Sequence, residues 1–240
     1  MGPQTERSLW KQGCANWDDY LSAKRAFSCG SASKDAFRKT IEKSRDALAF
    51  GEHQFFARKL KQKYAWRAWP EFKDSCVYLD IETDGGSDIT VIGLYDSKGF
   101  TALVKGEDLG NFPDLISHYS MIVTFFGTGF DIPVLQKTFK SFHFDQIHVD
   151  LCPMLRSLGY RGGLKSLEKQ FNIQRDPSVD GLNGYDAVKL WRRYRNLRDD
   201  RAMEKLIAYN RADVVNLQAL MVKAFKKMQY ATEMPDEQWA

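Results

Sequence analysis

The sequence is poor in cysteine and has no long apolar run. Its four cysteines, Cys14, Cys29, Cys76 and Cys152, are widely spaced and form no C-x-x-C pair. This spacing argues against a zinc site and fits reduced thiols. No apolar run approaches the ~20 residues needed to span a bilayer, and the polar first residues do not form a signal peptide. We therefore expect a soluble cytoplasmic protein.

The chain has no large excess of charge of either sign, but its charge is unevenly distributed. The formal net charge is +4. Residues 1–75 carry 15 Lys and Arg against 9 Asp and Glu, whereas residues 76–240 carry 20 against 22. A basic segment beside a mildly acidic domain fits a surface for a polyanion, and simple solvation of basic helices would give the same pattern. The charge pattern alone leaves both interpretations open.

The first third of the chain has helical patterns. Apolar and aromatic residues recur near helical spacing in Leu9–Leu21 and from residue 34 to about residue 64, with Ser33 placed to cap the second segment. These patterns predict a basic helical extension at the N-terminus. The sequence thus divides into three parts: residues 1–72, residues 73–230 and a short tail at residues 231–240.

From Cys76 the pattern changes to strands. Three strands are predicted at residues 76–83, 88–96 and 99–105, with turns short enough for antiparallel hairpins. Further strands are expected at residues 121–126 and 146–150, and helices at residues 107–118, from 131, and at 153–158, 164–171, 185–194 and about 200–228. This order predicts an α/β fold, in which three antiparallel strands and then parallel strands form a mixed sheet flanked by helices. It matches the RNase H-like architecture.

Two carboxylates lie one residue apart at the end of the first predicted strand, in Val77-Tyr78-Leu79-Asp80-Ile81-Glu82. Residues two apart on a strand point to the same side, so Asp80 and Glu82 should leave the same face of the sheet. A buried strand does not accept two such charges without compensation. A divalent cation would supply that compensation, so this pair predicts a metal site.

Three further acidic residues and a tyrosine follow predicted elements. Asp131 begins a helix, Asp150 ends a short strand, and Tyr209 and Asp213 lie four apart on the last helix, where they share a face. Hydrolysis of a phosphodiester by two divalent ions needs acidic ligands of this kind. Each residue also has an ordinary structural interpretation, since an Asp at a helix start is usually a cap. For Asp150 two roles are open. It either orients the metal ligands or caps the turn from the strand to the next helix.

Three strings together resemble a known family of nucleases. Asp80-Ile81-Glu82-Thr83, the Gly127–Asp131 segment and the Tyr209-x-x-x-Asp213 ending resemble the motifs of DEDD exonucleases, in the tyrosine-bearing DEDDy branch. The HVDL string at His148–Leu151 and the GGLKSLEKQFNI string at Gly162–Ile173 are similar to the YprB-like family of that branch. The histidine-bearing branch fits less well, because its histidine stands five residues before the last aspartate and this chain has Ala208 there.

The resemblance implies a site and a reaction. Asp80, Glu82, Asp131 and Asp213 would bind two Mg²⁺ or Mn²⁺ ions, with Asp80 bridging them, and Tyr209 would position the attacking water. The implied reaction is 3′-to-5′ release of nucleotides from single-stranded or recessed 3′ ends, with DNA slightly favoured over RNA. The family also makes a helicase a candidate protein partner.

Candidate substrate contacts lie beside these motifs. They are Thr83, Phe126, Lys165 and Arg211. Phe126 stands where the family commonly has an asparagine, and its ring is a candidate to stack on a terminal base. The two basic residues are candidates for phosphate contacts. A basic run at residues 192–198 is a further candidate, although such helices are usually solvated.

Two other functions are compatible with the same motifs. The first is a nucleic-acid-binding module that keeps the fold but is catalytically weak, which the loss of the asparagine at Phe126 would favour. The second is an RNase H-type endonuclease, whose usual four-acid site lacks the Tyr-x-x-x-Asp ending. Retention of all four carboxylates and of Tyr209 favours the exonuclease.

Overall fold

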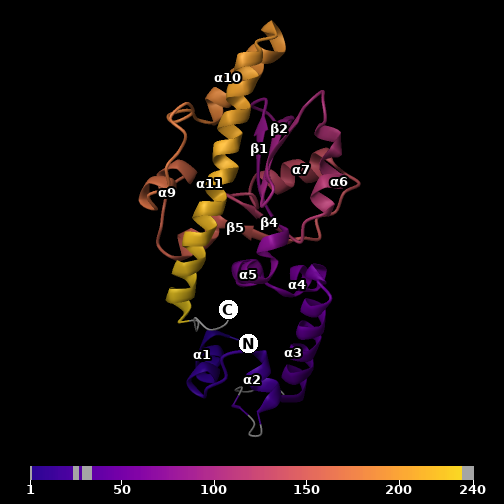
Figure 1. Ribbon diagram of the computed structural model, residues 1–240, viewed down its shortest axis with the longest axis vertical. Coiled ribbons are helices and arrows are strands. Elements are labelled where there is room, and N and C mark those ends of the chain that lie inside the picture. The colour runs from indigo at the N-terminus through magenta and orange to yellow at the C-terminus, as the bar shows by residue number, and fades with distance from the viewer. Residues whose placement is uncertain (1, 24–26, 29–33, 234–240) are drawn as a thin grey trace.

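A five-stranded mixed sheet lies at the centre of the fold in a computed structural model, which describes residues 2–23, 27–28 and 34–233 (Figure 1). The strands are β1 (Cys76–Thr83), β2 (Ile89–Asp96), β3 (Gly99–Val104), β4 (Met121–Thr124) and β5 (Ile147–Asp150). Their spatial order is β3-β2-β1-β4-β5. The first three pair antiparallel, whereas β4 pairs parallel with both β1 and β5. The predicted mixed sheet is therefore confirmed.

Helices surround the sheet and extend below it in the view of Figure 1. The N-terminal α-helices are α1 (Pro3–Lys11), α2 (Trp17–Ser22), α3 (Lys34–Ala49), α4 (His53–Lys59) and α5 (Trp69–Phe72). The α-helices after the first strand are α6 (Phe112–Ser117), α7 (Asp131–Thr138), α8 (Leu151–Ser157), α9 (Leu164–Gln170), α10 (Gly184–Leu197) and α11 (Asp200–Thr232). Short 3-10 helices are η1 (Gln62–Ala68), η2 (Lys73–Ser75) and η3 (Leu109–Asn111).

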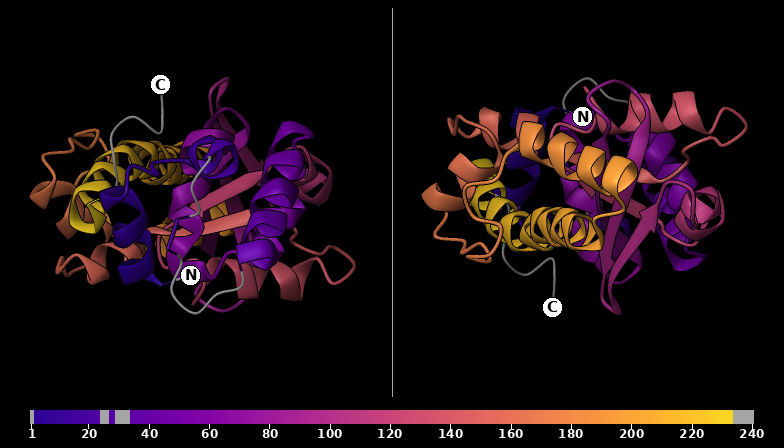
Figure 2. Two further views of the ribbon diagram at one scale, coloured as in Figure 1. Left: turned by 90° about the horizontal axis from the view of Figure 1, so that it is seen from below. Right: turned by 90° about the horizontal axis from the view of Figure 1, so that it is seen from above.

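Alternation along β1 divides the core between the two faces of the sheet. Val77, Leu79 and Ile81 pack in one cluster that includes buried residues of α6 and α7. Tyr78 packs in another cluster that includes much of α11. These helices cover opposite faces (Figures 1 and 2). Because successive side chains alternate, the even-numbered positions of β1, which include both of its carboxylates, face α11.

Helix α11 is the longest element, with 33 residues. The side chain of Asp199 caps its start by accepting a hydrogen bond from the Ala202 amide, and Glu233 in the left-handed conformation ends it. The start agrees with the sequence prediction, whereas the end lies four residues later than predicted. Among the described residues, no helix is both long and apolar enough to cross a bilayer.

The N-terminal region is helical, but its helices are shorter than the sequence pattern predicted. The first segment breaks after α1 at Gly13, which has φ +83°, and Asn16 then starts α2 with a capping box. The second breaks after α3 at Gly51, with φ +68°. Left-handed glycines end helices locally, so apolar spacing overestimates the length of each helix. The predicted cap Ser33 lies outside the described residues.

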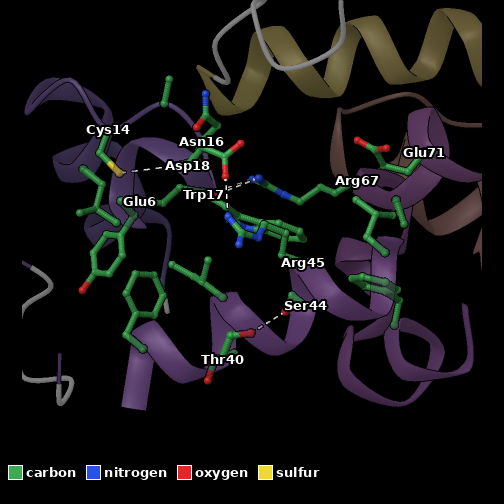
Figure 3. Close-up of a pocket in the computed structure, with 18 of the residues that line it drawn as sticks. Glu6, Cys14, Asn16, Trp17, Asp18, Thr40, Ser44, Arg45, Arg67 and Glu71 are labelled. Carbon is green, nitrogen blue, oxygen red and sulfur yellow. Dashed lines mark hydrogen bonds and ion pairs between the residues drawn. The ribbon is translucent and has the colours of Figure 1, made fainter. Parts of the chain in front are cut away.

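A largely apolar cavity of about 520 Å³ lies among the N-terminal helices (Figure 3). Arg67 donates two hydrogen bonds to Glu6 there, at 2.7 and 3.0 Å, and Arg45 pairs with Asp18. All of the lining residues come from positions 6–72, so none of the candidate carboxylates contributes to it. The candidate metal ligands lie instead on β1, α7 and α11.

Candidate metal centre

Three carboxylates converge between β1 and α11. Asp80, Glu82 and Asp213 each offer an oxygen, and these atoms lie within 4.8 Å of one another. The period of two along β1 places the first two on the face that α11 covers. Ligand oxygens on opposite sides of one Mg²⁺ lie roughly 4 Å apart. The cluster is therefore compact enough for divalent cations.

A fourth carboxylate, Asp131, lies next to β1 and acts electrostatically on Asp80 and Glu82. It is the first residue of α7 and is buried, with 3% of its surface exposed. Its Oδ1 accepts a hydrogen bond from the backbone amide of Ile81 at 3.1 Å. The start of α7 is thus tied to β1 between Asp80 and Glu82. Burial raises the pKa of the Asp131 carboxyl to about 7.

The environment raises the pKa values of the clustered carboxyl groups. Burial is the largest cause for Asp80, and the charges of Asp213, Asp131 and Glu82 add to it. Burial and then the charge of Asp213 raise the pKa of Glu82. Among the described residues, only Asp213 of the four forms an ion pair. The site thus has excess negative charge and oxygen donors, which are the properties that a hard divalent cation requires.

An asparagine holds Asp80 in place. Asn210 of α11 donates from Nδ2 to Asp80 Oδ2 at 3.0 Å and to its backbone oxygen at 3.3 Å. Gly93 lies opposite Asp80 in the β1–β2 register. A Cβ at Gly93 would lie 1.8 Å from Asn210 Oδ1, so this strand position has to be glycine for α11 to approach.

The Tyr209 hydroxyl borders the same site. Lys165 of α9 donates a hydrogen bond from Nζ to this oxygen at 3.3 Å, and Nζ lies 4.6 Å from the centre of the ring. Asp80, Lys165, Tyr209 and Asp213 all line a pocket of about 270 Å³. Burial is the main cause that raises the pKa of Tyr209, followed by the charge of Asp213. The phenol therefore stays protonated at neutral pH.

A buried arginine contacts Asp213. Nη2 of Arg175 forms a short ion pair with Asp213 Oδ1 and also bonds Glu168 Oε1 at 2.6 Å. Burial raises the pKa of Asp213, and the charge of Arg175 and its hydrogen bond lower it. Asp213 thus differs from the other carboxylates of the cluster in forming an ion pair with an arginine.

Asp150 organises the loop that leads from β4 to Asp131. Its carboxylate accepts hydrogen bonds from the backbone amides of Phe126 at 2.8 Å, Thr128 at 3.0 Å and Cys152 at 3.0 Å. The hydrogen bond from the Cys152 amide caps the start of α8, which is one of the two roles that the sequence predicted for Asp150. The other two hold the loop, so Asp150 orients the chain before Asp131.

The loop itself replaces the end of the predicted strand. The strand was expected to reach residue 126, but β4 ends at Thr124 because Phe126 has φ +64° and leaves the extended conformation. A Cβ at Gly129 would lie 2.5 Å from the Phe126 ring, so the ring rests directly on that glycine. Phe126 is 48% exposed, which makes it available to a ligand.

Comparison with protein families agrees with the fold. Residues 77–225 match the model of the RNase_H superfamily, which is more than half of the chain. The chain belongs to the RNase H superfamily. A comparison with curated proteins finds no match. Members of this superfamily are mostly nucleases. Their fold suggests a nucleic acid substrate for this domain.

The remaining sequence candidates lie at the edges of this RNase H superfamily domain. Thr83 ends β1 at an irregularity in its pairing with β2. Arg211 is two residues from both Tyr209 and Asp213 on α11, and its guanidinium lies 5.8 Å from the Phe100 ring of β3. It therefore points away from the side of α11 that carries the carboxylate. In the basic run of α10, Arg193 pairs with Asp199.

Several residues of the RNase H superfamily site were not predicted from the sequence. They are Gly93, Glu168, Arg175 and Asn210. Gly93 interrupts an apolar strand, and such a glycine indicates close approach of another segment. Glu168 and Asn210 lie inside the Gly162–Ile173 and Tyr209–Asp213 strings, but the spacing of those strings did not single them out, and Arg175 lies outside both. The packing of α9 and α11 brings these three side chains to the carboxylates.

Proposed function

We propose that this protein is a metal-dependent 3′-to-5′ exonuclease of the DEDDy branch, similar to the YprB-like family. Asp80, Glu82, Asp131 and Asp213 would hold two Mg²⁺ or Mn²⁺ ions. The observation that carries the proposal is the position of Tyr209, whose hydroxyl borders the same pocket as Asp80 and Asp213. An RNase H-type endonuclease site has four acids and no such tyrosine.

The side chains of the pocket have distinct roles in this proposal. Bound divalent ions would activate the attacking water and stabilise the leaving oxygen. Tyr209 is protonated and accepts a hydrogen bond from Lys165, so its own proton is available to a water or a phosphate oxygen. It orients the nucleophile and does not act as its base. Lys165 places a positive charge where a phosphate would bind.

Removal of the Tyr209 hydroxyl should slow the reaction without weakening metal binding. In the Tyr209→Phe variant we expect kcat to fall about 10- to 100-fold, since poorly positioned reactants cost rates of this order. Mn²⁺ affinity, measured by calorimetry, should stay within about twofold because the phenol is not a ligand. Lost Mn²⁺ binding in this variant, or an unchanged kcat, would contradict the positioning role.

The exposed ring of Phe126 is the candidate contact for a nucleobase. Its left-handed backbone conformation is unfavourable for a bulky residue, and Asp150 holds it by accepting from the Phe126 amide. Such strain is more often found at functional positions than elsewhere. An aromatic face can stack on any base, which fits an enzyme that acts on ends of different sequence.

Replacing this ring should weaken substrate binding more than catalysis. In Phe126→Leu, which keeps an apolar side chain but loses the aromatic face, we expect KM for a single-stranded oligonucleotide to rise about tenfold. The kcat should change little, because the carboxylates are untouched. Phe126→Tyr is the matched control and should retain the wild-type KM. Equal KM values in all three proteins would exclude stacking at this position.

Degradation of an end-labelled strand tests the proposed reaction. A 5′-labelled single-stranded DNA with Mn²⁺ should give a ladder that shortens one nucleotide at a time, and the same strand with a blocked 3′ end should stay intact. Parallel reactions with RNA and with a recessed duplex rank the substrates. Internal cuts in the blocked strand would instead identify an RNase H-type endonuclease. Binding without products at high protein concentration would identify a catalytically weak binding module.

A further inference from the structure

Arg175 is almost fully enclosed next to the carboxylate cluster. Only 4% of its side chain is exposed, although it lies in the connection between α9 and α10. Its guanidinium carbon lies 6.0 Å from the centre of the Tyr209 ring, and Nη2 pairs with Asp213. One buried cation therefore contacts both of the α11 residues that the proposed reaction needs.

Glu168 fixes this guanidinium in one orientation. Its Oε2 accepts from Arg175 Nε at 3.0 Å and its Oε1 accepts from Nη2 at 2.6 Å, which is a two-point contact. Asn216 of α11 donates to the same Oε1 at 2.9 Å. Glu168 is therefore held from two sides, by Arg175 and by Asn216.

The charges of this group are not balanced. Arg175 contributes one positive charge, and Glu168 and Asp213 contribute two negative charges. The two-point contact makes Glu168 the partner that neutralises Arg175, so Asp213 keeps its charge for a cation. Nη2 contacts Oδ1 of Asp213, which leaves Oδ2 without this partner. If Arg175 served only to neutralise Asp213, the two charges would balance without Glu168.

We propose that Arg175 is a positioning residue that orients Asp213 toward Asp80 and Glu82, and that Glu168 cancels its charge so that it does not compete with the metal. This inference rests on the proposed function, because it assumes that Asp213 binds a cation. It assigns two separate roles to the pair. The guanidinium supplies geometry, whereas the glutamate supplies charge balance, and substitutions can separate them.

The charge role is tested by Mn²⁺ binding to the full-length, metal-free protein. In Glu168→Gln, the charge of Arg175 acts on Asp213 alone, and calorimetry should show about tenfold weaker Mn²⁺ binding. The double variant E168Q/R175Q removes both charges and should bind Mn²⁺ within about threefold of wild type. Glu204→Gln, at an exposed position of α11, is the matched control and should bind like wild type. Wild-type affinity in Glu168→Gln, or no recovery in the double variant, would overturn the charge role.

The geometric role is tested by Arg175→Lys, which keeps the charge and loses the planar fork. Mn²⁺ affinity should stay within about threefold of wild type, while kcat at saturating Mn²⁺ falls at least tenfold. Unchanged kcat would overturn this role. The Arg175→Lys variant also keeps the inference testable if Glu168→Gln does not fold. Circular dichroism would show whether Glu168→Gln folds. Wild-type protein that binds Mn²⁺ but degrades no strand would contradict the proposed function, whereas the calorimetric comparison would still decide the charge role.

Discussion

Asp80→Asn should abolish cleavage and at the same time make the metal-free protein more stable. In the proposed function Asp80 would be a metal ligand, and its loss would remove several kcal/mol of stabilisation from the transition state, so we expect a rate reduction of about a thousandfold or more. Asp80 forms no ion pair among the described residues, and three neighbouring carboxylates raise its pKa in addition to burial. A neutral isostere removes that repulsion and still accepts the hydrogen bond from Asn210.

The gain in stability should be about 1–2 kcal/mol, measured by urea unfolding in EDTA near pH 7. Asp213→Asn should abolish cleavage equally but without this gain, because Arg175 would lose a charged partner in a buried site. Asp46→Asn on the exposed side of α3 is a matched control and should change neither property. Cleavage by Asp80→Asn within tenfold of wild type, or a less stable protein, would contradict the assignment.

Burial of these carboxyl groups, together with their mutual repulsion, gives the metal-free protein an unusual pH dependence. Burial raises the pKa of Asp131 from its ordinary value of 3.8 to about 7, and it also raises the pKa values of Asp80 and Glu82. Below pH 4 both the folded and unfolded chains are protonated and the penalty is absent. As the pH rises from about 4 to about 7 the unfolded chain releases protons that the folded chain retains, so stability in EDTA should fall. Asp80→Asn should reduce that slope.

Asp150→Ala should strongly destabilise the protein. Three backbone amides, those of Phe126, Thr128 and Cys152, would lose their acceptor. An unsatisfied buried donor costs about 1–3 kcal/mol of stability. Two of these three amides are only partly buried, so we expect the free energy of unfolding to fall by about 3–4 kcal/mol in total. Cleavage should also fall, because the loop before Asp131 would no longer be held.

Urea unfolding of a graded pair of variants checks this expectation. Asp150→Asn keeps one acceptor oxygen and should lose about half as much stability as Asp150→Ala. Asp46→Ala, at an exposed helical position, should stay within about 0.5 kcal/mol of wild type. If Asp150→Ala unfolds at the same urea concentration as wild type, then Asp150 does not hold the loop.

The part of the site that could be predicted from the sequence depends on short, regular spacing. The two-residue period of β1 placed Asp80 and Glu82 on one face, and the four-residue period of α11 placed Tyr209 beside Asp213. Both relations are local and need no knowledge of the rest of the fold. The sheet followed from strand lengths and turns in the same way.

The remaining features depend on contacts between distant segments or on single backbone angles. Arg175 and Asn210 reach the carboxylates only through the packing of α11 against β1 and α9, which no local pattern encodes. The early end of β4 results from one left-handed residue, Phe126. The N-terminal helices break at Gly13 and Gly51, whereas the apolar pattern continues through both positions.

The most direct test of the central claim is a crystal structure of the protein with Mn²⁺ and a nucleoside monophosphate, with the ions located by anomalous scattering. We predict Mn²⁺ bound by Asp80, Glu82, Asp131 and Asp213, with the phosphate facing Lys165 and the Tyr209 hydroxyl. An anomalous signal absent from these carboxylates, or a phosphate bound elsewhere with Tyr209 turned away, would contradict the account.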